Sequence, residues 1–259
     1  MMKNHKKRSK NQERSIKYFC YYIMTKLLTK NFIYQAKHCI PMTTMFDIEQ
    51  KCPVCGKVSS HQVLGSTNTM DYPDLDLRPA EMQRSTMNTW IDECPHCGYV
   101  SGDFRNETSI DEEFLKSESY LTCDGIEFIG YLSKRFYRAY MIAREMKDSN
   151  KCFFNLLHCA WDCDDKNDSN AVKMRKLALE HFDDLEYDEN EKKNYLAIKA
   201  DLLRRSGQFD QVIEEFSGIT IGEEPYDLIF QFQIEKSKEK DAECYTVGDA
   251  KNRMSDSPF

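Results

Sequence analysis

The sequence predicts an α+β protein in which a small zinc-ribbon-like module with a long insertion precedes an all-α domain of tetratricopeptide-like helical repeats. Three observations support this fold class. The motifs Cys52–Gly56 (CPVCG) and Cys94–Gly98 (CPHCG) share one pattern. Thirty-eight residues, 56–93, lie between the two cysteine pairs, more than a simple zinc ribbon requires. Beyond residue 110, apolar residues recur at helical spacing almost to the end of the chain.

The paired motifs are typical of a structural zinc site. In each motif, two cysteines separated by two residues can reach the same ion, and the glycine that follows permits a positive φ. A single C-x-x-C motif could equally be a redox pair, but two copies of one pattern favour a metal. Four thiolates leave no open coordination position, so we expect one structural zinc ion per chain. The expected ligands are Cys52, Cys55, Cys94 and Cys97.

Length and composition indicate a globular chain with a real core. The chain has 259 residues, of which 41% are hydrophobic. Its eleven cysteines do not predict a disulfide framework, because the chain is too long to need one and four of them have metal-site spacing. We therefore expect a cytoplasmic protein.

Charge is distributed unevenly. Residues 1–45 carry ten Lys or Arg and one acid, which leaves a net charge of −16 on residues 46–259. We expect residues 1–44 to be a basic extension outside the folded domains; an amphipathic anchor or a targeting segment are the alternatives. The apolar stretch around Tyr18–Ile23 is too short to span a bilayer. The predicted domains are then residues 45–107 for the zinc module and 108–259 for the helices.

Two elements are predicted between the motifs. Val58–Leu64 contains enough β-branched and apolar residues for a short strand. Pro79–Ile91 is predicted to be a helix, because proline suits a first helical turn and Glu81 suits the positive end of the helix dipole. We expect His61 and His96 on the surface, since four thiolates already complete the zinc site.

The polar residues of the insertion have two interpretations. An extended Asp74–Arg78 segment would pack its two leucines inward and turn its charged side chains outward. In the functional interpretation, the polar residues converge on a ligand or a partner. In the structural one, they pair with one another and brace the insertion. The residues concerned are Asn68, Asp74, Asp76, Arg78 and Arg84.

Three short strings in and after the insertion form a set: Pro73–Pro79 (PDLDLRP), Arg84–Met87 (RSTM) and Glu93–Tyr99 (ECPHCGY). Together they resemble a bacterial family of uncharacterised proteins, classed as a domain of unknown function. Its members combine paired CPxCG zinc knuckles with a tetratricopeptide-like helical tail. The resemblance extends from about Met45 to the C-terminal region. It implies the four cysteines as metal ligands and implies no activity.

The second half of the chain is predicted to be helical, with turns at Asp124–Gly125, Asp164–Asp168 and Ser206–Gly207. The predicted helices are 111–123, 128–146, 152–163, 170–182, 191–205, 208–216, 226–238 and 241–247. Residues 200–212 have the small residue, turn glycine and aromatic position of a tetratricopeptide helix pair, and residues 159–172 resemble them at a spacing of 40. Stacked helical hairpins of this kind commonly bind a peptide or protein in a groove.

Three further cysteines with helical spacing have two interpretations, as a second metal site or as buried core residues. Cys152, Cys159 and Cys163 share one face of a predicted helix, and His158 is adjacent. Cysteines on the buried stripe of a helix are more often small hydrophobic residues, and we expect that here. Trp161 is likewise expected to pack at an interface.

Charge and motif content separate the possible functions. Residues 46–105 hold five basic and nine acidic residues, which argues against nucleic-acid binding because phosphate contacts need clustered Lys and Arg. An enzyme or small-ligand binder using residues 68–84 is an alternative, but no nucleophile with a base and no Gly-rich phosphate loop is present. We expect a zinc-binding cytoplasmic adaptor or scaffold that binds a protein partner, with no membrane partner.

Overall fold

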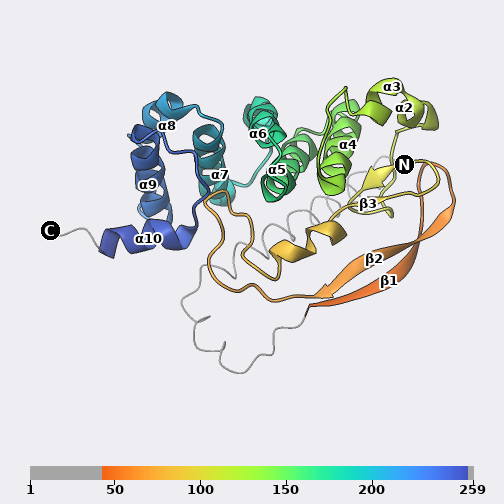
Figure 1. The fold of residues 1–259 in the computed structure, drawn as a ribbon, viewed down its shortest axis with the longest axis horizontal. Helices are drawn as coiled ribbons and strands as arrows, with labels where there is room; N and C mark the ends of the chain where they lie inside the picture. The colour runs from red at the N-terminus through yellow and green to blue at the C-terminus, as the bar shows by residue number, and fades with distance from the viewer. Residues whose placement is uncertain (1–42, 256–259) are drawn as a thin grey trace, which may run out of the picture.

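The computed structural model describes residues 43–255, and the predicted extension of residues 1–44 lies outside them except for its last two residues. Two small antiparallel hairpins come first and a mostly helical region follows (Figure 1). The hairpins are β1 (Thr44–Lys51) with β2 (Val58–Ser66), and β3 (Asp92–Glu93) with β4 (Val100–Ser101).

Strand β2 confirms the predicted strand, whereas β1 is not among the predicted elements. The two strands pair from Lys51 opposite Val58 outward to Thr44 opposite Ser66, with an irregularity between Thr44 and Met45. Most β1 side chains are exposed, so the strand has little of the apolar pattern that marks a buried strand. Pairing with β2, rather than intrinsic patterning, accounts for this strand.

The helical region forms a row in sequence order, from α2 and α3 at one end to α9 and α10 at the other (Figure 1). The α-helices are α2 (Glu112–Lys116), α3 (Glu118–Thr122), α4 (Tyr131–Glu145), α5 (Ser149–Asp165), α6 (Asn170–Glu180), α7 (Lys192–Arg205), α8 (Phe209–Phe216), α9 (Tyr226–Lys238) and α10 (Val247–Ser255). Short 3-10 helices occur at η1 (Arg84–Thr89), η2 (Phe182–Asp184) and η3 (Glu189–Glu191). Tetratricopeptide repeats and the domain limits 45–107 and 108–259 stay predictions.

Two predicted helices of this region are wrong in part. The helix predicted for residues 111–123 is two short helices, because Ser117 is extended and its side chain caps α3 by accepting from the Tyr120 N–H. The helix predicted for residues 241–247 is irregular chain. There the carbonyls of Asp241 and Glu243 each accept from the Arg204 guanidinium at 2.8 Å, so these carbonyls serve tertiary contacts.

Helix α4 begins where a neighbouring helix supplies its cap. The Asp162 carboxylate of α5 accepts from the Ser133 N–H at 2.7 Å and from the Ser133 hydroxyl at 2.6 Å. Gly130 makes room for this cap, since a Cβ there would lie 2.3 Å from an Asp162 oxygen. Buried Asp162 therefore joins helices α4 and α5.

Buried apolar residues form two clusters. The first joins α2–α6 with residues around the second cysteine motif, including Met87, Ile91 and Val100. The second joins α7–α10 and includes Leu75 of the insertion. Helix α7 lies between the clusters, because Ile198 packs in the first and Ala197 in the second. The insertion therefore contributes to both parts of the core.

The helix predicted for Pro79–Ile91 is wrong in most of its length. Only η1 is helical, and the preceding Met82 has a φ of 71°, which interrupts an α-helix before it can form. Thr86 and Met87 of η1 are buried. We call residues 67–83, between β2 and η1, the strap. It runs beneath the row of helices toward α10 and returns (Figure 1).

None of the helices in the described part of the chain has the length and apolar character needed to cross a membrane.

Candidate metal centre and insertion

Each cysteine motif is the tip of a hairpin. Cys52 directly follows β1, and β2 begins two residues after Gly56. Cys94 directly follows β3, and β4 begins two residues after Gly98. The strands thus hold both turns at equivalent positions.

The two turns also have the same backbone hydrogen bonds. The Gly56 N–H donates to the Cys52 carbonyl at 3.0 Å, and the Gly98 N–H to the Cys94 carbonyl at 2.9 Å. Both glycines adopt the expected positive φ, 71° and 74°, which residues with a Cβ rarely adopt. The shared CPxCG pattern therefore specifies one local structure twice.

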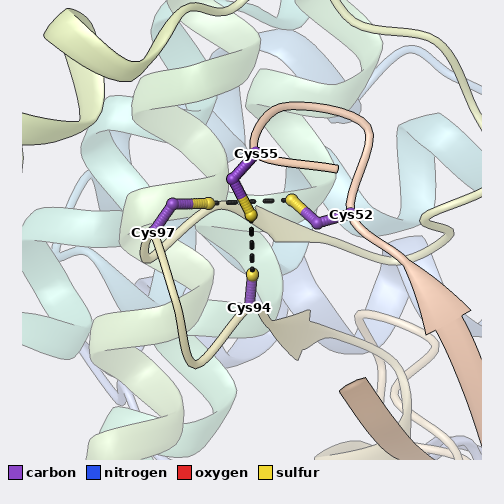
Figure 2. Close-up of side chains that lie close together, drawn as sticks. All are labelled: Cys52, Cys55, Cys94 and Cys97. Atoms are coloured by element: carbon purple, nitrogen blue, oxygen red, sulfur yellow. Dashed lines mark hydrogen bonds between the residues drawn. The ribbon is translucent and has the colours of Figure 1, made fainter. Parts of the chain in front are cut away.

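The four sulfur atoms converge between the two turns (Figure 2). Cys52 Sγ lies 3.6 Å from Cys97 Sγ, and Cys55 Sγ lies 3.7 Å from Cys94 Sγ, so each short distance joins one motif to the other. All four sulfurs lie within 4.8 Å of one another. A tetrahedral zinc ion with bonds of about 2.3 Å sets its thiolates about 3.8 Å apart, so this donor set fits zinc.

The cysteine environments agree with a closed structural site. Cys52 and Cys94 are 1% exposed, and the other two are half-buried. Burial raises the pKa of the Cys52 and Cys97 thiols. At Cys55 burial acts in the same direction, but hydrogen bonds from the Lys57 backbone and the neighbouring cysteines lower the pKa. A bound zinc ion would favour the thiolate at all four positions and stabilise the fold.

Helices α3 and α4 hold the second motif in place. Glu93, next to Cys94, accepts from Arg138 Nη1 at 2.9 Å and from the Tyr131 hydroxyl at 2.6 Å. The Tyr120 hydroxyl donates to the Gly98 carbonyl at 2.6 Å. The metal centre is thereby fixed against the start of the helical row.

The surface location predicted for His61 is wrong, whereas His96 is exposed as expected. His61 is 6% exposed, with its ring nitrogens 2.7 Å from Ser59 Oγ and 3.4 Å from an Asp92 oxygen. Its ring also packs edge-on against Phe104. His61 on β2 and Asp92 on β3 thus join the two hairpins. The alternating pattern of a strand does not predict this contact.

The outward orientation predicted for the charged residues of Asp74–Arg78 is wrong. The segment is a turn, in which the Leu77 N–H donates to the Asp74 carbonyl and Leu77 has a φ of 65°. Strand alternation therefore does not apply. Asp74, Asp76 and Arg78 are all buried, at 3%, 1% and 4% exposed.

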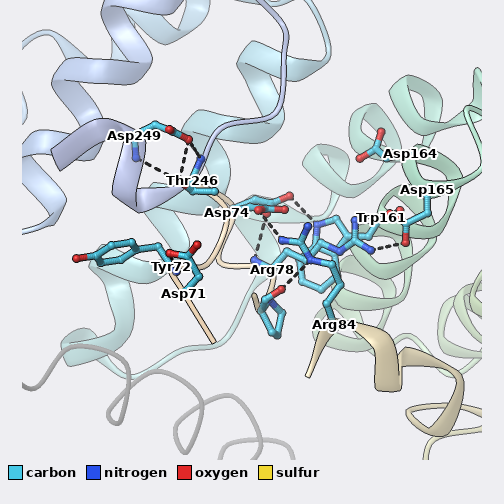
Figure 3. A network of polar contacts seen from close by, with 12 residues as sticks. Asp71, Tyr72, Asp74, Arg78, Arg84, Trp161, Asp164, Asp165, Thr246 and Asp249 are labelled. Carbon is cyan, nitrogen blue, oxygen red and sulfur yellow. Dashed lines mark hydrogen bonds and ion pairs between the residues drawn. The ribbon is translucent and has the colours of Figure 1, made fainter. Parts of the chain in front are cut away.

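Two of these residues bind α5. Asp76 accepts from Trp161 Nε1 at 2.6 Å. Arg78 forms a bidentate pair with Asp165 at 3.0 and 2.5 Å and donates to the Trp161 carbonyl at 3.4 Å (Figure 3). The predicted interface role of Trp161 is confirmed, because it contacts both strap residues.

The other two charged residues pair within the insertion, as the structural interpretation expects. Arg84 donates to Asp74 Oδ1 at 2.5 Å and to the Pro79 carbonyl at 2.9 Å (Figure 3). Asn68 does not share the burial of this group and is exposed. The five polar residues thus have different side-chain partners: Asp76 and Arg78 bind α5, Asp74 and Arg84 bind each other, and Asn68 faces solvent.

Electrostatics around Asp76 reflect its burial. Burial raises the pKa of Asp76 to about 6, and nearby Asp201 and Asp74 act in the same direction. Arg205, whose Nη1 is 3.9 Å from Asp76 Oδ2, opposes the shift. Burial also raises the pKa of Asp74, against the effect of Arg84. Burial is therefore the largest cause of both shifts.

The second cysteine group contains small buried residues, as expected. Cys152, Cys159 and Cys163 are at most 2% exposed, and the Cys159 thiol donates to the Ser133 carbonyl. Among the described residues, the four motif cysteines are the one group of potential ligand side chains that lie close enough together to hold a metal ion. His158 lies instead among the aromatic rings of Phe136, Phe154 and Trp161.

Sequence reasoning missed the helical residues that complete these contacts. Asp165 was part of an expected turn, and Glu93 and Arg138 were not singled out. Arg78 and Asp165 are 87 positions apart. The sequence signal for such a partner is an arginine beside leucines that are expected to be buried, and this signal does not say where in the chain the acidic partner lies.

Comparisons with protein-family models, curated proteins and solved structures found no match to this chain. The resemblance to a family with paired CPxCG knuckles therefore rests on the motifs. What the structure adds to those motifs is a four-cysteine group whose geometry fits zinc.

Proposed function

We propose that this chain is a zinc-binding cytoplasmic adaptor or scaffold, in which one structural zinc ion fixes the hairpins and the helical region binds a protein partner. The observation that carries the proposal is the convergence of four thiols from two equivalent turns within 4.8 Å. A four-thiolate site has no open position for a substrate or water. Zinc would accordingly stabilise the platform and take no part in a reaction.

The alternative of an enzyme or small-ligand binder at residues 68–84 has weaker support. Asp76 and Arg78 are buried and already paired with α5, and Asp74 is paired with Arg84. Groups used in this way have few free donors or acceptors for a ligand. Their pairing favours a scaffold role for the insertion.

A cytoplasmic location is supported by the cysteines. The nine cysteines of residues 43–255 are free thiols, and five of them lie outside the proposed zinc site. Free buried cysteines persist in a reducing compartment. Nucleic acid remains a poorer partner, because the zinc module carries more acidic than basic residues.

The proposal is tested by metal analysis and cross-linked capture of the full chain from native cells. We expect one zinc ion per chain and a reproducible protein partner. Cys97→Ser should lose both the metal and the partner, because metal binding and folding are coupled. Exposed Asn68→Ala should retain both. Folded chain without metal would overturn the zinc centre. A co-purifying small molecule that is lost in Asn68→Ala would favour the ligand-binding alternative.

A further inference from the structure

The strap connects the metal centre to the far end of the helical row. Its two ends continue into the hairpins that carry the cysteine motifs, so the zinc site closes a loop between Cys55 and Cys94. Its middle lies beside the chain that enters α10 (Figures 1 and 3). A single segment thus spans both parts of the molecule.

Backbone contacts fix the middle of the strap. The Leu75 N–H donates to the Tyr245 carbonyl and the Val247 N–H donates to the Pro73 carbonyl, both at 2.9 Å. Asp74 and Thr246 form the antiparallel bridge between these two hydrogen bonds. The strap therefore adds an extended partner to the residues that lead into α10.

The Leu75 side chain makes this contact part of the core. Leu75 is fully buried in the second apolar cluster, with residues of α7 and with Val247 and Ala250 of α10. Truncating such a leucine leaves a cavity that the surroundings fill only in part. Helices α7–α10 are thus packed around a residue that belongs to the insertion.

The next residues of the strap bind the first cluster. Asp76 and Arg78 bind Trp161 and Asp165 of α5, as described above. Within five residues, the strap therefore contacts both clusters. Any change that frees the ends of the strap acts on both contacts.

We infer that zinc occupancy controls the docking of the strap, and through it the stability of the segment from Tyr245 to α10. The inference rests on the proposed zinc centre. With zinc bound, both ends of the strap are fixed, and docking orders only its middle. Without zinc, the link between the two ends rests on protein contacts such as that of His61 with Asp92, so docking bears more of the entropic cost of closing the loop between the motifs. Zinc removal therefore loosens a region at the opposite end of the molecule.

Reciprocity gives the first test. If zinc favours docking, docking must favour zinc by the same factor, so weakening the far end of the strap must weaken zinc binding. Zinc affinity is measured on the full chain by competition with a chromogenic chelator. We expect Leu75→Ala to lower the affinity at least about tenfold. The matched control is Val212→Ala, which truncates a fully buried side chain of the same cluster on α8. It should stay within about twofold of the unmodified chain, because it does not alter the strap.

Hydrogen exchange gives a second test. It uses the unmodified chain, so its result does not depend on whether a substituted chain folds. On chelation, the amides of Leu75 and Val247 should lose protection at least about tenfold, whereas Leu156 in the centre of α5 should retain it. Loss confined to Gly56 and Gly98 would overturn the inference, as would Leu75→Ala with unchanged zinc affinity. A folded chain that binds no zinc would overturn the proposed centre as well, so the two failures are distinguishable.

Discussion

Arg78→Ala tests whether the charged residues of the strap brace the fold. Arg78 is 4% exposed, and its guanidinium makes two hydrogen bonds to Asp165. Removing one partner of a buried ion pair costs about 3–5 kcal/mol. The Asp165 side chain is 47% exposed, so water can hydrate the carboxylate that is left behind. We therefore expect the free energy of unfolding to fall by about 2–3 kcal/mol.

The chain supplies a matched control in Arg105→Ala. Arg105 also binds an aspartate through two hydrogen bonds, to Asp103 at 2.8 Å each, but its side chain is 82% exposed. An exposed pair contributes less than about 1 kcal/mol. The two arginines differ mainly in burial and in the contacts of Arg78 with Trp161. The difference between the two losses in the free energy of unfolding therefore measures how much the buried position of Arg78 contributes to stability.

The assay is urea unfolding with zinc in excess, followed by circular dichroism, together with partner capture from cells. If Arg78 braces the fold, Arg78→Ala should lose clearly more stability than Arg105→Ala, and capture should fall only as far as unfolding explains. Equal stability of the two variants would refute the reasoning. Unchanged stability with abolished capture would assign Arg78 to partner recognition instead.

Two further predictions concern groups whose roles the structure separates from the metal centre. Because burial raises the pKa of Asp76 to about 6 from 3.8, the folded chain binds this proton more tightly than the unfolded chain does. The stability that this proton contributes is present below about pH 3.8 and is lost as pH rises through about 6. Asp76→Asn should remove this decline, as measured by unfolding at several pH values, and an unchanged pH profile would contradict it. Cys159→Ser and Cys163→Ser should each retain one zinc ion per chain in elemental analysis, because these cysteines lie outside the metal group; loss of metal from a folded variant would contradict this.

The cysteine turns could be predicted from sequence because their structure is local. Each motif carries its own hydrogen bonds and positive-φ glycine within five residues. The longer helices follow from the same kind of information, since apolar spacing specifies one face of a helix. The expected helix at Tyr226–Lys238 has these bounds in the structure.

The insertion could not be predicted because distant residues determine its conformation. Leu75 hydrogen-bonds with Tyr245, and Arg78 pairs with Asp165. Local patterning describes Asp74–Arg78 as an extended segment with its leucines packed and its charges outward, but in the structure the segment is a turn whose charged side chains are buried against partners elsewhere in the chain. The same limit explains His61, whose burial depends on Asp92 and Phe104.

The contact between Leu75 and the chain before α10 also has a consequence for synthesis on the ribosome. The zinc motifs emerge early and can bind metal while translation continues, but the strap has to wait for Tyr245 and Val247, close to the C-terminus. Until then Leu75 lacks the backbone partner and the α10 residues that later cover it, and an uncovered apolar side chain favours aggregation. A chain that stops before residue 245 would lack both the Tyr245 backbone partner and the α10 residues that cover Leu75. Premature termination near the C-terminus should therefore also destabilise the strap, which lies in the N-terminal half of this protein.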